Sequence, residues 1–441
     1  MLSLYYYRIF LLINCAILFA IYVAFGLNIN IMPYSYICLL MINVYMLLQS
    51  RKNFLLFIVF FIILFSNYSI IYSNFIVRID DSMFTDVLSE RTRNVSINIL
   101  TLFNLMLFFL VRWSAVHSLP GKNIFIDHAK QDKVITLLLS IILIVVFFVG
   151  FQIPEKEGER GSSSPLYEYS IFFFVLYFLY SGEGKKEIYW GLFLVFAFSM
   201  QNFIFGGRIY GLQFILAAYI MVFMHRFSMA KVIFALAVVF VFFSIIGAVR
   251  GELLSGNFDV QSILLSIIQR GFALDTAFSA YFTSTSFVYL DERVDPDVHV
   301  ALFLDFFKSI FVGSGANPDS VLPQFSSDYV THYFGGLLPF YLYFYLGSFG
   351  ILLSALLLAF YLNILISLTI SSSNFWKCIM VWIVSTTFRW YLYSPLPLLR
   401  GVLLFVIVYY VFAYFHYMLN RLPLRKKSFK WNVNNHKVRP T

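Results

Sequence analysis

The stretch GLLPFYLYFYLGSFGILLSALLLAFYLNILISLTI, residues 336–370, contains no charged side chain over its whole length. A helix needs roughly 20 apolar residues to cross a bilayer, so this run is long enough for one span and a further short piece. Pro339, Gly347 and Gly350 punctuate its first half. We therefore predict a short re-entrant piece followed by a full membrane span, rather than one long bent helix.

The whole chain has the composition of an integral membrane protein. Its 441 residues are 61% hydrophobic and only 12% charged, which is more apolar surface than a soluble domain can bury. The 54 Phe suit lipid contact, and the 30 Tyr suit the membrane–water interface. The net charge of +9 does not indicate a nucleic-acid partner, because the basic residues lie in short loops and a tail, where they report topology.

The chain contains about twelve apolar runs long enough to cross a bilayer. They predict an all-α, polytopic membrane protein of about twelve transmembrane helices. The first run has no cleavage site and is interpreted as a retained helix. The three cysteines, inside apolar runs, have no metal or redox spacing. We divide the chain into a bundle of about nine spans (1–248), an extracytoplasmic loop with amphipathic helices (249–335), C-terminal spans (336–419) and a basic cytoplasmic tail (420–441). The runs are 4–26, 31–48, 53–73, 95–116, 133–151, 166–181, 187–204, 208–225, 230–249, 336–370, 374–392 and 395–419.

The cations of the loops predict the orientation. One side, with both termini and the tail, holds 19 of the 31 Lys and Arg, of which 12 are Lys, and is predicted to be cytoplasmic. The other side holds 12, of which 10 are Arg. Guanidinium forks match phosphate and carboxylate oxygens, so this bias indicates an anion on the outer face. A bias in composition is the alternative explanation.

Several of these arginines come from helix ends at the outer boundary. Arginine inside a membrane is costly, and snorkelling to lipid headgroups is the alternative role for each one. The stretch FGGRIYG, residues 205–211, places glycines beside an arginine, where they leave room for a headgroup. We predict a pocket for a lipid-linked pyrophosphate. The predicted pyrophosphate-binding residues are Arg208, Arg250, Arg270, Arg389 and Arg400.

The large loop supplies candidates for proton transfer. We expect an amphipathic helix over 261–282, which includes Asp275, and a short helix over 300–311. The carboxylates of 291–297 are expected to form a solvated turn at Pro296. Asp328 and His332 are spaced so that a helix would place them on one face, where the carboxylate could orient the imidazole. An interfacial histidine without a catalytic role is the alternative.

The chain resembles the O-antigen and capsule repeat-unit polymerases, which are related to the O-antigen ligases. GGRIYG (206–211), the single large outer loop and HYFGGLLPFYLYFYLGSFG (332–350) carry the resemblance. It implies a GT-C-like fold and an inverting, metal-independent and cofactor-free glycosyltransferase of the bacterial cytoplasmic (inner) membrane. The substrates would be undecaprenyl-pyrophosphate-linked glycans, and the partners would be membrane lipids and a chain-length regulator.

The resemblance also implies roles for single residues. His332, Asp328 and Asp275, in that order, are the candidates to accept the proton of the attacking hydroxyl, and Gly207, Tyr210 and Tyr333 are assigned to substrate binding. The ligases carry a His–Asn pair where this chain has His332–Tyr333, which favours a polymerase over a ligase. The alternatives are an O-antigen ligase, a flippase or transporter for the same lipid-linked oligosaccharide, and a membrane scaffold.

Overall fold

The computed structural model describes residues 2–71, 89–116, 131–153, 161–205, 207–224, 274–313, 321–332, 335–368 and 372–421, with isolated positions between 228 and 264. These residues are almost entirely helical. The described strands β1 (Phe151–Gln152) and β2 (Ser162–Ser163) form one short antiparallel pair, with Phe151 opposite Ser163. The result confirms the all-α class.

The first half of the chain supplies the following elements: α1 (Leu2–Phe25), α2 (Met32–Ser50), α3 (Phe54–Ile71), α4 (Glu90–Leu110), the 3-10 turn η3 (Trp113–Ala115), α5 (Lys133–Val149), α6 (Pro165–Glu168), α7 (Ile171–Ser181), α8 (Lys185–Ile204), α9 (Arg208–Ala218) and the π-helical turn η4 (Tyr219–Phe223). The second half supplies α12 (Leu274–Asp291), α13 (Pro296–Phe311), α14 (Leu322–Ser327), α15 (Leu338–Leu346), α16 (Ser348–Ser367), α17 (Asn374–Ser385), α18 (Thr387–Leu392) and α19 (Leu396–Arg421).

Within the described ranges, six helices are long and apolar enough to cross a membrane: α2, α3, α4, α8, α16 and α19. Five further apolar helices have 10–17 residues. The protein is therefore a helical membrane protein by length and composition, while twelve spans and a GT-C-like architecture stay predictions. Most of the ninth predicted run, 230–249, lies outside the described residues.

The apolar run 336–370 is divided into two helices at Gly347, one of the positions at which the sequence predicted a break. α15 has 9 residues and α16 has 20, and Gly347 joins them with a φ of 58°, a conformation that favours glycine. A Cβ at Gly350 would overlap the backbone carbonyl of Leu342, so α16 returns against α15 at close range. A short piece followed by a helix of spanning length is confirmed.

The run 374–392 is not one continuous helix, because it divides into α17 and α18 at Thr386. The hydroxyl of Thr386 donates to the Trp382 carbonyl at 2.8 Å, and that of Thr387 donates to the Val384 carbonyl at 2.8 Å. Hydroxyls that bond carbonyls one turn back bend helices. The break leaves Arg389 on a short helix beneath the protein surface rather than at the end of a span.

α12 differs from the predicted loop helix. It includes residues 274–282 of the predicted stretch 261–282, continues to Asp291 and packs against α3, α4 and α15, while most of 261–273 lies outside the described residues. Its buried hydroxyls at 283–286 bond carbonyls of their own helix, such as Ser284 to Ala280 at 2.7 Å, which is why a polar stretch can lie inside the bundle. Asp291 ends α12 and Pro296 opens α13, as the expected turn requires.

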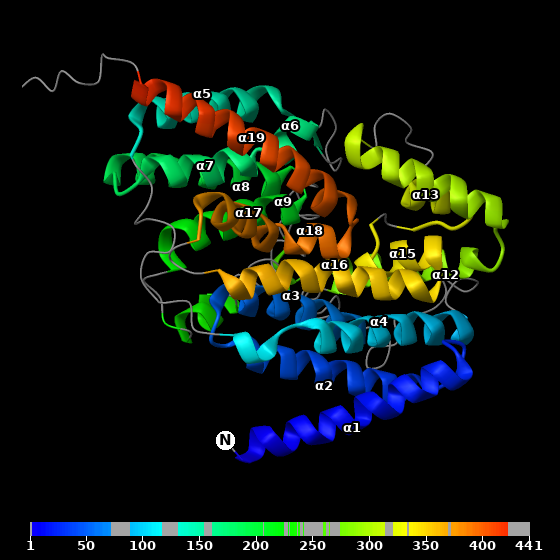
Figure 1. The fold of residues 1–441 in the computed structure, drawn as a ribbon. Helices are drawn as coiled ribbons and strands as arrows, with labels where there is room; N and C mark the ends of the chain where they lie inside the picture. Colours follow the sequence, from blue (N-terminus) through cyan, green and yellow to red (C-terminus); the bar gives the residue numbers. More distant parts are fainter. Residues whose placement is uncertain are drawn as a thin grey trace, which may run out of the picture.

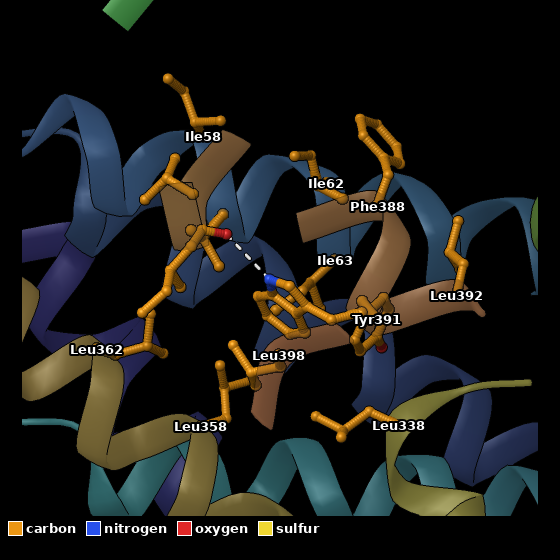
Figure 2. Close-up of a cluster of buried hydrophobic side chains, with 14 of the residues drawn as sticks. Ile58, Ile62, Ile63, Leu338, Leu358, Leu362, Phe388, Tyr391, Leu392 and Leu398 are labelled. Atoms are coloured by element: carbon orange, nitrogen blue, oxygen red, sulfur yellow. Dashed lines mark hydrogen bonds between the residues drawn. The ribbon is translucent and has the colours of Figure 1, made fainter. Parts of the chain in front are cut away.

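The core lies where α3, α15, α16, α18 and the start of α19 meet. Figure 2 shows Ile58, Ile62 and Ile63 of α3 close to Phe388 and Tyr391 of α18, with further leucines beneath them. These apolar contacts hold α18 and its arginine in place.

The helix ends gather at two opposite ends of the bundle (Figure 1). One end contains the two described termini, at α1 and α19. The other contains α12, α13 and α15, and contacts such as the ion pair of Arg91 with Glu292 at 2.7 Å join its segments. We refer to this second end as the loop end; the sequence predicts that it is the outer face.

Candidate anion-binding site

Glu168 is the centre of a polar cluster at the loop end. It is the last residue of α6, a single turn that Ser164 caps by accepting a hydrogen bond from the Tyr167 amide at 3.3 Å. Its Oε2 accepts a hydrogen bond from Nη2 of Arg389, and its Oε1 accepts from the hydroxyls of Ser163 and Tyr210, each at 3.2 Å. The side chains of Arg389 and Glu168 are 12% and 22% exposed, so this is a largely buried, charge-assisted pair.

Aromatic rings surround the two described arginines of the predicted pocket. Cζ of Arg389 lies 4.8 Å from the ring centroid of Tyr210 and 5.6 Å from that of Tyr169. Cζ of Arg400 lies 6.0 Å from the ring centroid of Tyr169. Each guanidinium is therefore within the range of a cation–π interaction, and Tyr169 joins α18 and α19 electrostatically.

Arg400 differs from Arg389 in that it has no acid beside it. It is half-buried in the second turn of α19, and its buried Nε has no hydrogen-bond partner. Its guanidinium lies directly on Gly313, where the chain leaves α13 with a φ of 103° and a side chain would overlap it. The carbonyl end of α13 offers a partial negative charge, but no described carboxylate neutralises this cation.

Two glycines of FGGRIYG, Gly207 and Gly211, pack against aromatic rings. A Cβ at Gly207 would lie 2.8 Å from the ring of Tyr210, and one at Gly211 would lie 2.5 Å from the ring of Phe203. Ser199 also donates to the Gly211 carbonyl at 3.1 Å, which fixes α8 against α9. At these two positions the missing side chain gives room to the protein's own rings rather than to a headgroup, and the substrate-binding assignment of Gly207 stays a prediction.

His332 is buried, and its partner is not the one expected. α14 ends at Ser327, and Asp328 lies exposed in the following turn, so the prediction of a shared helix face is wrong. Instead, Nε2 of His332 lies 2.6 Å from Oγ of Ser326, which donates its own proton to the Pro323 carbonyl at 3.0 Å. Because Oγ of Ser326 already donates to a carbonyl, we assign the ring proton to Nε2.

The segment after His332 returns to the arginine cluster. The amide of Gly336 donates to the Leu392 carbonyl at 3.0 Å, and the hydroxyl of Tyr341 donates to the Tyr393 carbonyl at 2.5 Å. Tyr393 is bonded in turn to the backbone of Arg389, at 3.0 Å. The backbone thus connects the two predicted groups, the histidine segment and Arg389, at the C-terminal end of α18.

The remaining predicted residues are placed only in part. Arg208 is the first residue of α9 and Asp275 lies in the first turn of α12, but their side chains lie outside the described part of the structure. Arg250, Arg270 and Tyr333 lie wholly outside it. Their predicted roles stay predictions.

The sequence analysis missed Glu168. The available signal was a single carboxylate near the start of the apolar run 166–181, where a charge is costly unless it is paired. Its partner Arg389 is 221 positions away along the chain, so sequence spacing alone did not identify the pair.

Burial lowers the pKa of His332 below its ordinary value of about 6.5. The folded state therefore binds this proton less readily than the unfolded state, and the resulting stability is fully present above pH 6.5 and is lost as the pH falls through the lowered pKa. We expect His332→Gln to reduce the drop in unfolding temperature between pH 7.5 and pH 5 in detergent. Asp328→Asn is the control at an exposed position. A full acid response in His332→Gln would contradict the assignment.

No family model, no curated protein and no solved structure matches this chain.

Proposed function

We propose that this protein is a membrane glycosyltransferase that polymerises lipid-pyrophosphate-linked oligosaccharide repeat units into an O-antigen or capsular polysaccharide. The observation that supports the proposal best is Arg400, a half-buried guanidinium at the loop end that forms no ion pair with any carboxylate in the described part of the chain. A cation in this position suits a substrate that brings its own negative charge. The resemblance of residues 206–211 and 332–350 to the polymerases supplies the substrate class.

The chemistry requires two kinds of group, and the cluster has candidates for both. A hydroxyl of the acceptor sugar attacks the anomeric carbon of the donor, the bond from that carbon to the pyrophosphate oxygen breaks, and the pyrophosphate leaves with the electron pair. Arg400 would stabilise the charge that grows on the leaving oxygen. His332 would take the proton of the attacking hydroxyl, because the buried ring is neutral near pH 7.

In this proposal Arg389 and Arg400 have different roles. Glu168 neutralises Arg389, which places the guanidinium between the rings of Tyr169 and Tyr210 and makes it part of the wall of the site. Arg400 keeps its full charge for a ligand. In this proposal Arg389 positions the site, while Arg400 contacts the pyrophosphate.

The proposal predicts the surface polysaccharide of a strain that lacks the gene. For a cell with a lipopolysaccharide core, we expect gels of the surface polysaccharide to show core carrying one repeat unit and no longer chains. Core without any repeat, together with lipid-linked polymer, would indicate the ligase. Single lipid-linked repeats retained in the cytoplasm would indicate the flippase. Unchanged chain lengths would contradict all three.

A further inference from the structure

The exposed face of α13 is apolar. Val300, Leu304, Phe307, Phe311 and Val312 are each 53–68% exposed, and they recur at spacings of three and four residues or lie next to one another, so they share one face. Ala301 is also exposed there, and the charged residues on this face are Asp297 in the first turn and Lys308. The opposite face packs against α15 and α19, with Leu302, Phe306 and Ile310 buried. We call the five exposed apolar residues the α13 stripe.

Contact between the α13 stripe and water is unfavourable. Exposing several large apolar side chains costs about 25 cal/mol for each Å² of their area, so a helix of this kind lies in lipid rather than in a solvated loop. The 16 residues of α13 extend over about 24 Å, comparable to most of the hydrocarbon core. α13 also contacts α19, whose residues Leu403, Ile407 and Val411 are exposed one to three turns after Arg400.

The stripe ends at the uncompensated cation. Val312 is followed by Gly313, on which the guanidinium of Arg400 lies. The same guanidinium lies near the ring of Tyr169, which directly follows α6. In Figure 1, α13 lies beside the N-terminal part of α19. An apolar path along the outside of the protein therefore leads to a half-buried positive charge, which is the charge pattern of a lipid with an anionic head.

We propose that the junction of α13 and α19 is the entry site for a polyprenyl phosphate or pyrophosphate, with the phosphate on Arg400 and the isoprenoid tail along the α13 stripe. The choice of a polyprenyl carrier rests on the proposed function. The junction supplies a head contact and a tail contact from different helices, so each can be removed separately. Ordinary bilayer phospholipids would cover the stripe without using Arg400 selectively.

The test uses the full-length protein in phosphatidylcholine nanodiscs that contain a small fraction of either undecaprenyl phosphate or undecaprenol, with retained lipid measured by native mass spectrometry. We expect wild type to retain undecaprenyl phosphate selectively. Arg400→Gln should lower that retention by about tenfold or more, since it removes charge-assisted hydrogen bonds to the phosphate, and should leave undecaprenol unchanged. Phe307→Asn with Phe311→Asn should lower the retention of both lipids.

The matched control changes an exposed apolar stripe elsewhere, with Ile13→Asn and Ile17→Asn on α1, and should leave the retention of both lipids unchanged. A photo-crosslinking residue at position 307, compared with one at position 13, tests the same contact in a nearly native chain and should label undecaprenyl phosphate only at 307. Equal labelling at both positions, or full displacement by phosphatidylglycerol, would show a general lipid surface and overturn the proposal. The two proposals can fail separately. If the carrier binds at this junction but the deletion strain has normal chain lengths, the binding site stands and the polymerase function is refuted.

Discussion

Arg400→Gln is expected to lower the rate of polymer synthesis by about 10²–10³-fold, because loss of one fixed donor to a growing oxyanion has an effect of that size. The half-buried guanidinium would act at the boundary between protein and lipid, where the low dielectric strengthens its interaction with the leaving pyrophosphate. The rate is measured with purified protein and a lipid-linked repeat unit as both donor and acceptor. The amount of folded protein is compared by size-exclusion chromatography in detergent.

Arg400→Lys separates a pyrophosphate contact from simple snorkelling. Lysine keeps the charge but loses the planar fork that binds two phosphate oxygens, so we expect a rate between those of wild type and Arg400→Gln. Lys308→Gln is the control, because this exposed cation on α13 is held by Asp305 at 3.0 Å and has no role in the proposed site. A wild-type rate in Arg400→Lys would favour snorkelling and remove Arg400 from the reaction.

The elements that the sequence predicted well depend on local physics. Runs without charges predicted the helices, and Gly347 predicted the break between α15 and α16, because a φ of 58° is accessible to glycine and costly for other residues. The helix predicted over 300–311 is present as α13, although it begins four residues earlier, at Pro296. In each case the residue carries its own conformational preference, so the chain around it is sufficient evidence.

The elements that the sequence did not predict depend on distant partners. Nothing near Glu168 indicates Arg389, and nothing near Arg400 indicates Gly313, because in each pair the two residues come from separate helices. The division of the run 374–392 depends on the carbonyls to which the hydroxyls of Thr386 and Thr387 donate. Threonine also occurs inside unbroken helices, such as Thr283 in α12, so its presence alone does not predict a break. Asp328 and His332 had the correct spacing for a pair on a helix, but α14 ends at Ser327, before either residue.

Glu168→Gln is expected to destabilise the protein by about 3–5 kcal/mol, because it leaves the largely buried guanidinium of Arg389 without its counter-ion. The hydroxyls of Ser163 and Tyr210 would also lose a charged acceptor. The measurement is the free energy of unfolding in detergent, or the unfolding temperature where unfolding is irreversible. The control is Glu292→Gln, which breaks the Arg91–Glu292 pair, whose side chains are 63% and 46% exposed, and which should change stability by less than about 1 kcal/mol.

The double variant Glu168→Gln with Arg389→Gln decides whether the pair is structural. Removing both charges leaves no unpaired ion, so the double variant should be more stable than Glu168→Gln alone, even though it lacks one more native side chain. If the double variant is no more stable than the single one, the pair does not act as a buried ion pair. If Glu168→Gln is as stable as wild type but inactive, the carboxylate belongs to the reaction, and Glu168 joins His332, Asp328 and Asp275 as a candidate proton acceptor.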